Sequence, residues 1–151
     1  YLKKAIQAQS VLYCCALNFA ELAHNIEKTE REIYADKANK NIGTKPFRHD
    51  YPNQRLKVVK LIGDIWADVR SMSTLLNMNL DSTFMQSAMT LFPSVGLDGY
   101  DLFMAETALR SDISQIISDD GDFATVPGIT LFTANQRVIQ DAKATKKLLV
   151  R

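Results

Sequence analysis

The chain has 151 residues, of which 46% are hydrophobic and 23% are charged, and its formal net charge is +1. This length and composition suit one globular domain over residues 1–151 and exclude an intrinsically disordered chain. No apolar run approaches the roughly 18 residues that would span a membrane, and the near-neutral charge restricts any basic, nucleic-acid-binding surface to a local patch.

The N-terminal part predicts a helix, a buried strand and a second helix. Residues 1–9 are typical of a helix end, and the apolar residues 10–17 are expected to form a strand buried on both faces. Cys14 and Cys15 would point to opposite faces of that strand, so no disulfide is expected between them and a reducing, cytoplasmic setting fits. Asn18 is the expected N-cap of the helix that follows.

That helix is predicted to continue through residues 33–34 and to end before a long basic connection. Residues 38–53 hold Gly43, Pro46 and Pro52, which break regular structure, and they separate the helix from another over residues 54–76.

The second half alternates helices with short strands. The pattern predicts helices over residues 81–92, 100–110 and 135–148 and strands over residues 113–118 and 129–133. Short apolar strands between helices are typical of an α/β protein with a small parallel sheet flanked by helices. In such sheets functional groups collect where strands end and the next helices begin.

Three acids occupy such positions. Glu21 and Asp101 each lie in the first turn of a predicted helix, and Asp120 comes just after the strand over residues 113–118. Carboxylates converging on one point require a hard cation to hold them together. The alternative is structural, since acids stabilise helix N-termini through the helix dipole and Asp-rich stretches form turns. Residues 119–122 do not begin an EF-hand, because no bidentate Glu follows.

The order of these motifs resembles the PIN-domain nucleases, in particular the toxins of bacterial toxin–antitoxin pairs. The resemblance lies in Gly-Tyr-Asp-Leu-Phe-Met-Ala-Glu-Thr-Ala-Leu at residues 99–109, Ile-Ser-Asp-Asp-Gly-Asp-Phe at residues 117–123 and the weaker Asn-Phe-Ala-Glu-Leu-Ala at residues 18–23. It implies a Rossmann-like PIN domain that hydrolyses RNA phosphodiesters with Mg²⁺ or Mn²⁺.

The resemblance also assigns roles to residues. Glu21, Asp101 and Asp120 would hold the metal, Asp122 would be an accessory acid of the catalytic set, and the Ser118 hydroxyl would support the site. Asp119 falls on a variable position. The family opens with a strand that ends in a further Asp, yet no acid precedes Glu21 here. We therefore expect the domain over residues 1–151 to lack that first strand, and RNA cleavage to need it.

The basic connection is a second candidate for RNA contact. Lys40, Lys45 and Arg48 could bind phosphates, with Phe47, His49 and Tyr51 interleaved for base stacking. The alternative is a solvated connection without function. The resemblance further implies an antitoxin partner and a homodimer. A PIN-like module that has lost catalysis and binds RNA or protein is the alternative function.

Overall fold

The computed structural model describes residues 2–149 and divides them into two compact units. The helical unit comprises Leu12–Asn77, and the mixed unit combines the residues up to Val11 with those from Met78 onward. None of the helices within residues 2–149 is long and apolar enough to cross a bilayer.

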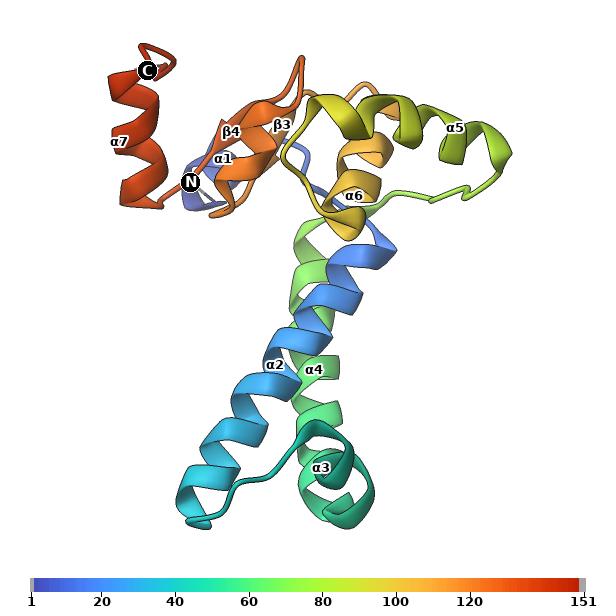
Figure 1. Ribbon diagram of the computed structural model, residues 1–151, viewed down its shortest axis with the longest axis vertical. Helices are drawn as coiled ribbons and strands as arrows, with labels where there is room; N and C mark the ends of the chain where they lie inside the picture. Colours follow the sequence, from blue (N-terminus) through green and yellow to red (C-terminus); the bar gives the residue numbers. More distant parts are fainter. Residues whose placement is uncertain (1, 150–151) are drawn as a thin grey trace. The chain divides into compact units, whose positions relative to one another are not determined.

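The helical unit is built on two long helices, α2 (Ala16–Lys37) and α4 (Pro52–Met72), which lie side by side (Figure 1). The short helix α3 (Thr44–Asp50) packs against both. Strands β1 (Tyr13–Cys14) and β2 (Thr74–Leu75) pair in parallel. The core of this unit consists of Ala35, Ile42, Phe47 and Val58.

Three local expectations for the helical unit were wrong. The strand over residues 10–17 is limited to β1, and its partner β2 lies in residues expected to belong to or follow a helix. Asn18 does not cap α2 from outside; the helix begins at Ala16, and the Asn18 Oδ1 accepts a hydrogen bond of 2.7 Å from the Cys15 amide. Residues 38–53 do connect the two long helices, but they contain α3 because burial of Phe47 stabilises a helix too short to persist alone.

The mixed unit carries the other expected elements in the expected order. It contains α1 (Leu2–Gln7), α5 (Ser82–Leu91), the 3₁₀ turn η1 (Phe92–Ser94), α6 (Gly99–Arg110), β3 (Gln115–Ile117), the 3₁₀ turn η2 (Gly121–Thr125), β4 (Thr130–Phe132) and α7 (Gln136–Ala144). Strands β3 and β4 pair in parallel with Ile116 opposite Leu131. Helices with small parallel sheets make this an α/β protein, as predicted.

The helix starts of the mixed unit follow from local side-chain chemistry. Asp81 accepts a hydrogen bond from the Phe84 amide, Asp98 from the Tyr100 and Asp101 amides, and Asn135 from the Arg137 amide. Such caps satisfy amides that have no partner within the helix. The core behind these helices consists of Ala88, Leu97, Leu102, Ala105, Phe123 and Val126.

Candidate functional site

An acidic turn follows β3 and is held in shape by its own side chains. The Asp120 amide donates to Ser118 Oγ over 3.0 Å, and the Asp122 amide donates to Asp120 Oδ1 over 2.9 Å. Asp120 therefore caps η2 in addition to being a candidate metal ligand. The exposed side chains of Asp120 and Asp122 therefore belong to one hydrogen-bonded turn.

The turn before α6 packs against η2. The Gly96 amide donates to Thr125 Oγ1 over 2.8 Å, and a Cβ atom on Gly96 would lie 3.8 Å from Asp122 Cγ. Asp122 thus lies beside the segment that leads into α6, and the half-buried Asp101 lies in the first turn of that helix. The segment that leads into α6 therefore packs against the turn after β3, and the convergence of Asp101 with Asp120 on one metal ion stays a prediction.

Asp119 has a structural role that the sequence did not reveal. Its Oδ1 accepts hydrogen bonds from Thr133 Oγ1 at 3.1 Å and the Ala134 amide at 3.0 Å, and its carbonyl accepts from Asn135 Nδ2 at 2.9 Å. These bonds join the acidic turn to the segment between β4 and α7. The polar residues Thr133 and Asn135 at and just after the end of a predicted strand were the signal in the sequence that could have indicated this contact.

Glu21 lies on α2 in the helical unit and is exposed. Asp101, Asp120 and Asp122 belong to the mixed unit. The grouping of Glu21 with those three acids stays a prediction from the family resemblance.

The donor chemistry of the mixed-unit acids suits a divalent cation. Carboxylate oxygens are the ligands that Mg²⁺ and Mn²⁺ prefer, and Mg²⁺ keeps several waters, so few protein ligands suffice. Within residues 2–149, no three His, Cys, Asp or Glu side chains come together closely enough to hold a metal ion. Assignment of the ligands therefore rests on donor type and on the position of each acid in the fold.

The basic connection is partly neutralised within the helical unit. Arg48 donates to both oxygens of Glu27, with Nε–Oε1 and Nη2–Oε2 distances of 2.7 and 2.6 Å, and Arg55 lies 3.3 Å from Oε1. The hydrogen bond from Arg48, aided by the positive charges of Arg48 and Arg55, lowers the pKa of Glu27 although its partial burial acts in the opposite direction. The Arg48 guanidinium is thus already bound to a carboxylate, whereas Lys40 and Lys45 are exposed.

One expectation about this connection was wrong. Phe47 was expected to be available for base stacking, but only 1% of it is exposed because it forms the core between α2, α3 and α4.

Comparison with known proteins gives one match. A family model described as the PIN domain matches residues 1–129. No curated protein and no solved structure matches the chain. PIN domains are commonly nucleases, act on nucleic acid and generally use divalent metal ions.

Proposed function

We propose, from the premise that this chain belongs to the PIN domain family, that it is a metal-dependent endoribonuclease. The observation that carries the proposal is the packing of the acidic turn after β3 against the segment that leads into α6. That packing brings Asp122 beside Gly96, which precedes Asp101 in the chain, and the Asp122 amide is bonded to Asp120. Family membership indicates a nuclease-type function. The RNA substrate and the metal dependence of this chain are the parts that we add.

In this proposal Glu21, Asp101 and Asp120 hold Mg²⁺ or Mn²⁺. A bound cation would supply an activated water and would offset negative charge on the phosphate oxygens during hydrolysis. Ser118 keeps the acidic turn in shape through its bond to the Asp120 amide, and Asp122 adds negative charge beside the start of α6. Lys40, Lys45 and Arg48 would contact RNA phosphates, and Arg48 would have to exchange its bond to Glu27 for such a contact.

The test compares isosteric variants of two acids with a matched control. Asp101→Asn and Asp120→Asn remove a negative charge each without changing side-chain volume. Asp112→Asn is the control, because Asp112 is an exposed acid of the same unit whose backbone φ of 56° also suits Asn. Measured on a protein that also carries the expected first strand, cleavage of a fluorophore-quencher RNA should require Mg²⁺ or Mn²⁺. It should fall at least about tenfold in the first two variants, as is common when a metal site loses charge.

Binding of Mn²⁺ by calorimetry should weaken in the same two variants and not in the control. Cleavage that persists at full rate in both Asp101→Asn and Asp120→Asn would contradict the catalytic assignment. RNA binding without cleavage, unaffected by either variant, would instead support a non-catalytic RNA-binding module. The basic connection makes that the second candidate function, since it can bind phosphates whether or not the acids act.

An antitoxin partner and a homodimer complete the proposal. An antitoxin should cover the acids, so a purified complex should cleave RNA more slowly than the free chain. A homodimer should double the mass measured by light scattering. A monomeric mass at all concentrations would remove the homodimer from the proposal.

A further inference from the structure

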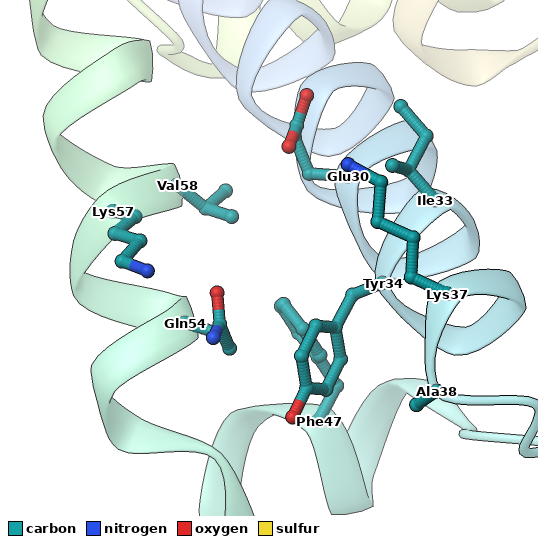
Figure 2. A pocket seen from close by; sticks show the side chains of 9 residues that line it. All are labelled: Glu30, Ile33, Tyr34, Lys37, Ala38, Phe47, Gln54, Lys57 and Val58. Atoms are coloured by element: carbon teal, nitrogen blue, oxygen red, sulfur yellow. The ribbon is translucent and has the colours of Figure 1, made fainter.

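The helical unit contains a pocket of about 370 Å³ between α2, α3 and α4 (Figure 2). This volume is within the range of small-molecule and nucleotide sites, which is roughly 300–1,000 Å³. The pocket contains none of the candidate metal ligands. In Figure 2, Glu30, Tyr34 and Lys37 from α2 line one side, and Gln54 and Lys57 from α4 line the other.

The apolar part of the pocket offers a rigid aromatic wall. Tyr34 is half-buried, and its ring makes an edge contact with Tyr51, at a centroid distance of 5.3 Å, and a tilted contact with Phe47 at 6.2 Å. The buried Val58 lies at the α4 side. Because packing fixes the Tyr34 ring, a flat ligand stacked against it would lose little side-chain entropy on the protein's side.

The polar part offers groups that suit the two ends of a nucleotide. Lys37 and Lys57 are exposed ammonium groups on opposite sides of the pocket. Among the described residues neither forms an ion pair, unlike Arg48 and Lys60. Gln54 can donate to and accept from a base edge, and the Glu30 carboxylate can accept from an exocyclic amino group. Glu30 would repel a phosphate, so it also sets which end of a nucleotide can approach it.

The surrounding chain adds long-range attraction for a polyanion. Residues 37–60 contain seven Lys or Arg and a single acid, Asp50. Three of those seven are paired with carboxylates that lie outside this segment, and Lys37, Lys40, Lys45 and Lys57 make up the remainder. A basic segment with a stacking surface is the combination that single-stranded nucleic acid requires.

We propose that this pocket binds one nucleotide of single-stranded RNA, with the base stacked against Tyr34 and hydrogen-bonded by Gln54 and Glu30, and the flanking phosphates bound by Lys37 and Lys57. The inference rests on the proposed function, because it takes RNA as the substrate. It assigns the helical unit a role in holding the strand that the acids of the mixed unit do not supply.

The test measures RNA binding in EDTA by fluorescence anisotropy, so that no cleavage occurs. Lys37→Ala with Lys57→Ala should weaken binding about tenfold and reduce the slope of log K against log salt by about 1.4, since each phosphate contact to a single strand contributes about 0.7. The matched control, Lys28→Ala with Lys60→Ala, removes the same charge from the same two helices outside the pocket and should change affinity by less than about threefold.

A second variant tests insertion of the base. Gln54→Ala should weaken binding of RNA and leave binding of an abasic strand of equal length unchanged. Equal losses in the two lysine pairs, an equal effect of Gln54→Ala on both strands, or no RNA binding by the unmodified chain would each overturn the inference. Displacement of RNA by polyglutamate as effectively as by unlabelled RNA would point to an acidic protein partner instead and would also overturn it.

These results separate the pocket from the proposed catalytic function. If cleavage depends on Asp101 but the substitution of Lys37 and Lys57 has no specific effect on RNA binding, the proposed RNA-binding role of the pocket is rejected and the nuclease proposal is kept. Pocket-dependent binding of RNA without any cleavage that depends on Asp101 or Asp120 rejects the nuclease alone.

Discussion

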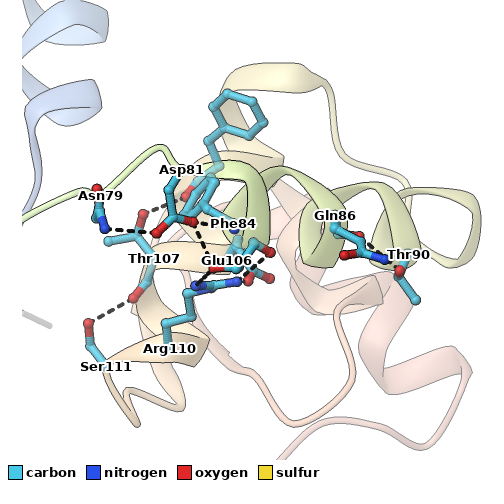
Figure 3. A network of polar contacts seen from close by, with 11 residues as sticks. Asn79, Asp81, Phe84, Gln86, Thr90, Glu106, Thr107, Arg110 and Ser111 are labelled. Atoms are coloured by element: carbon cyan, nitrogen blue, oxygen red, sulfur yellow. Dashed lines mark hydrogen bonds and ion pairs between the residues drawn. The ribbon is translucent and has the colours of Figure 1, made fainter.

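Replacement of Arg110 by Met should destabilise the mixed unit strongly, because it leaves a buried carboxylate without its partner. Glu106 on α6 is only 3% exposed, and its Oε1 accepts a hydrogen bond of 2.6 Å from Arg110 Nε. Arg110 also donates to the Thr83 carbonyl at 2.7 Å and lies 5.3 Å from the centre of the Phe84 ring (Figure 3). One guanidinium therefore joins the end of α6 to the start of α5.

The expected loss from Arg110→Met is about 3 kcal/mol. An unpaired buried carboxylate costs about 1–3 kcal/mol, the lost bond to Thr83 about 1 kcal/mol and the lost contact with Phe84 about 0.5–1 kcal/mol. Arg110 is 39% exposed at its side chain, so solvent screening favours the lower part of these ranges. The Met side chain keeps the apolar contacts of the arginine stem.

The decisive comparison is with the double variant Glu106→Gln, Arg110→Met. It removes the unpaired charge, so it should be more stable than Arg110→Met alone by about 1–2 kcal/mol. Tryptophan fluorescence would report on the helical unit, because the single tryptophan, Trp66, lies there. The measurement is therefore urea unfolding followed by far-UV circular dichroism, together with hydrogen exchange of the α6 amides. Arg137→Met on exposed α7 is the control and should stay within about 0.5 kcal/mol. A loss below about 1 kcal/mol for Arg110→Met, or a double variant less stable than the single one, would refute the reasoning.

Three further changes test other contacts. Glu27→Gln should lower the free energy of unfolding by about 1 kcal/mol at neutral pH. Because binding to Arg48 lowers the pKa of Glu27 in the folded state, this loss should be complete above the ordinary glutamate pKa of about 4.5 and should vanish as the pH falls through the lowered pKa. Urea unfolding at several pH values measures the difference. A pH-independent difference would contradict that origin. Asp119→Ala should cost about 1–2 kcal/mol and speed hydrogen exchange of the Ala134 amide, with Asp141→Ala, at an exposed acid within α7, as the unaffected comparison. Gly121→Ala would place a Cβ 2.9 Å from Val138 Cγ2 and should lower the free energy of unfolding by about 1–2 kcal/mol, measured by thermal unfolding. In a Val138→Ala background the same change should cost little, because the contacting methyl groups are gone. An equal cost in both backgrounds would show that the clash is not the cause.

The parts of the fold that sequence predicted well are those fixed by neighbouring residues. The helices α5, α6 and α7 begin within one residue of their predicted starts. Asp81, Asp98 and Asn135 cap them, and a cap needs only a short polar side chain and an amide two or three residues later. Strand β2 was missed because Thr74 and Leu75 form a strand only through hydrogen bonds with residues about sixty positions earlier, such as the 2.8 Å bond from the Thr74 amide to the Leu12 carbonyl. Such long-range pairing leaves no periodic signal in two residues.

The candidate site divides in the same way. The turn from Ser118 to Asp122 is local, and its type could be inferred from its Asp and Gly residues. The contact between Gly96 and Thr125 and the role of Asp119 could not, since both depend on segments that meet only after the unit has folded. Phe47 shows the converse, since an aromatic residue within a basic, proline-containing stretch was expected at the surface and instead forms a core.

The candidate acidic residues and the basic residues lie in different units, and this predicts different kinetic effects when each set is substituted. The mixed unit contains Asp119, Asp120 and Asp122 in a stretch of four residues, whereas the basic segment over residues 37–60 belongs to the helical unit. Groups that bind phosphates equally in the substrate and in the transition state change KM, and groups that act only on the reacting phosphate change kcat. Lys37→Ala with Lys57→Ala should therefore raise KM for RNA with little change in kcat, while Asp101→Asn should lower kcat with little change in KM. If both sets of variants lowered kcat alone, the lysines would have to act on the reacting phosphate. The assignment of binding to the lysines and of catalysis to the acids would then be wrong.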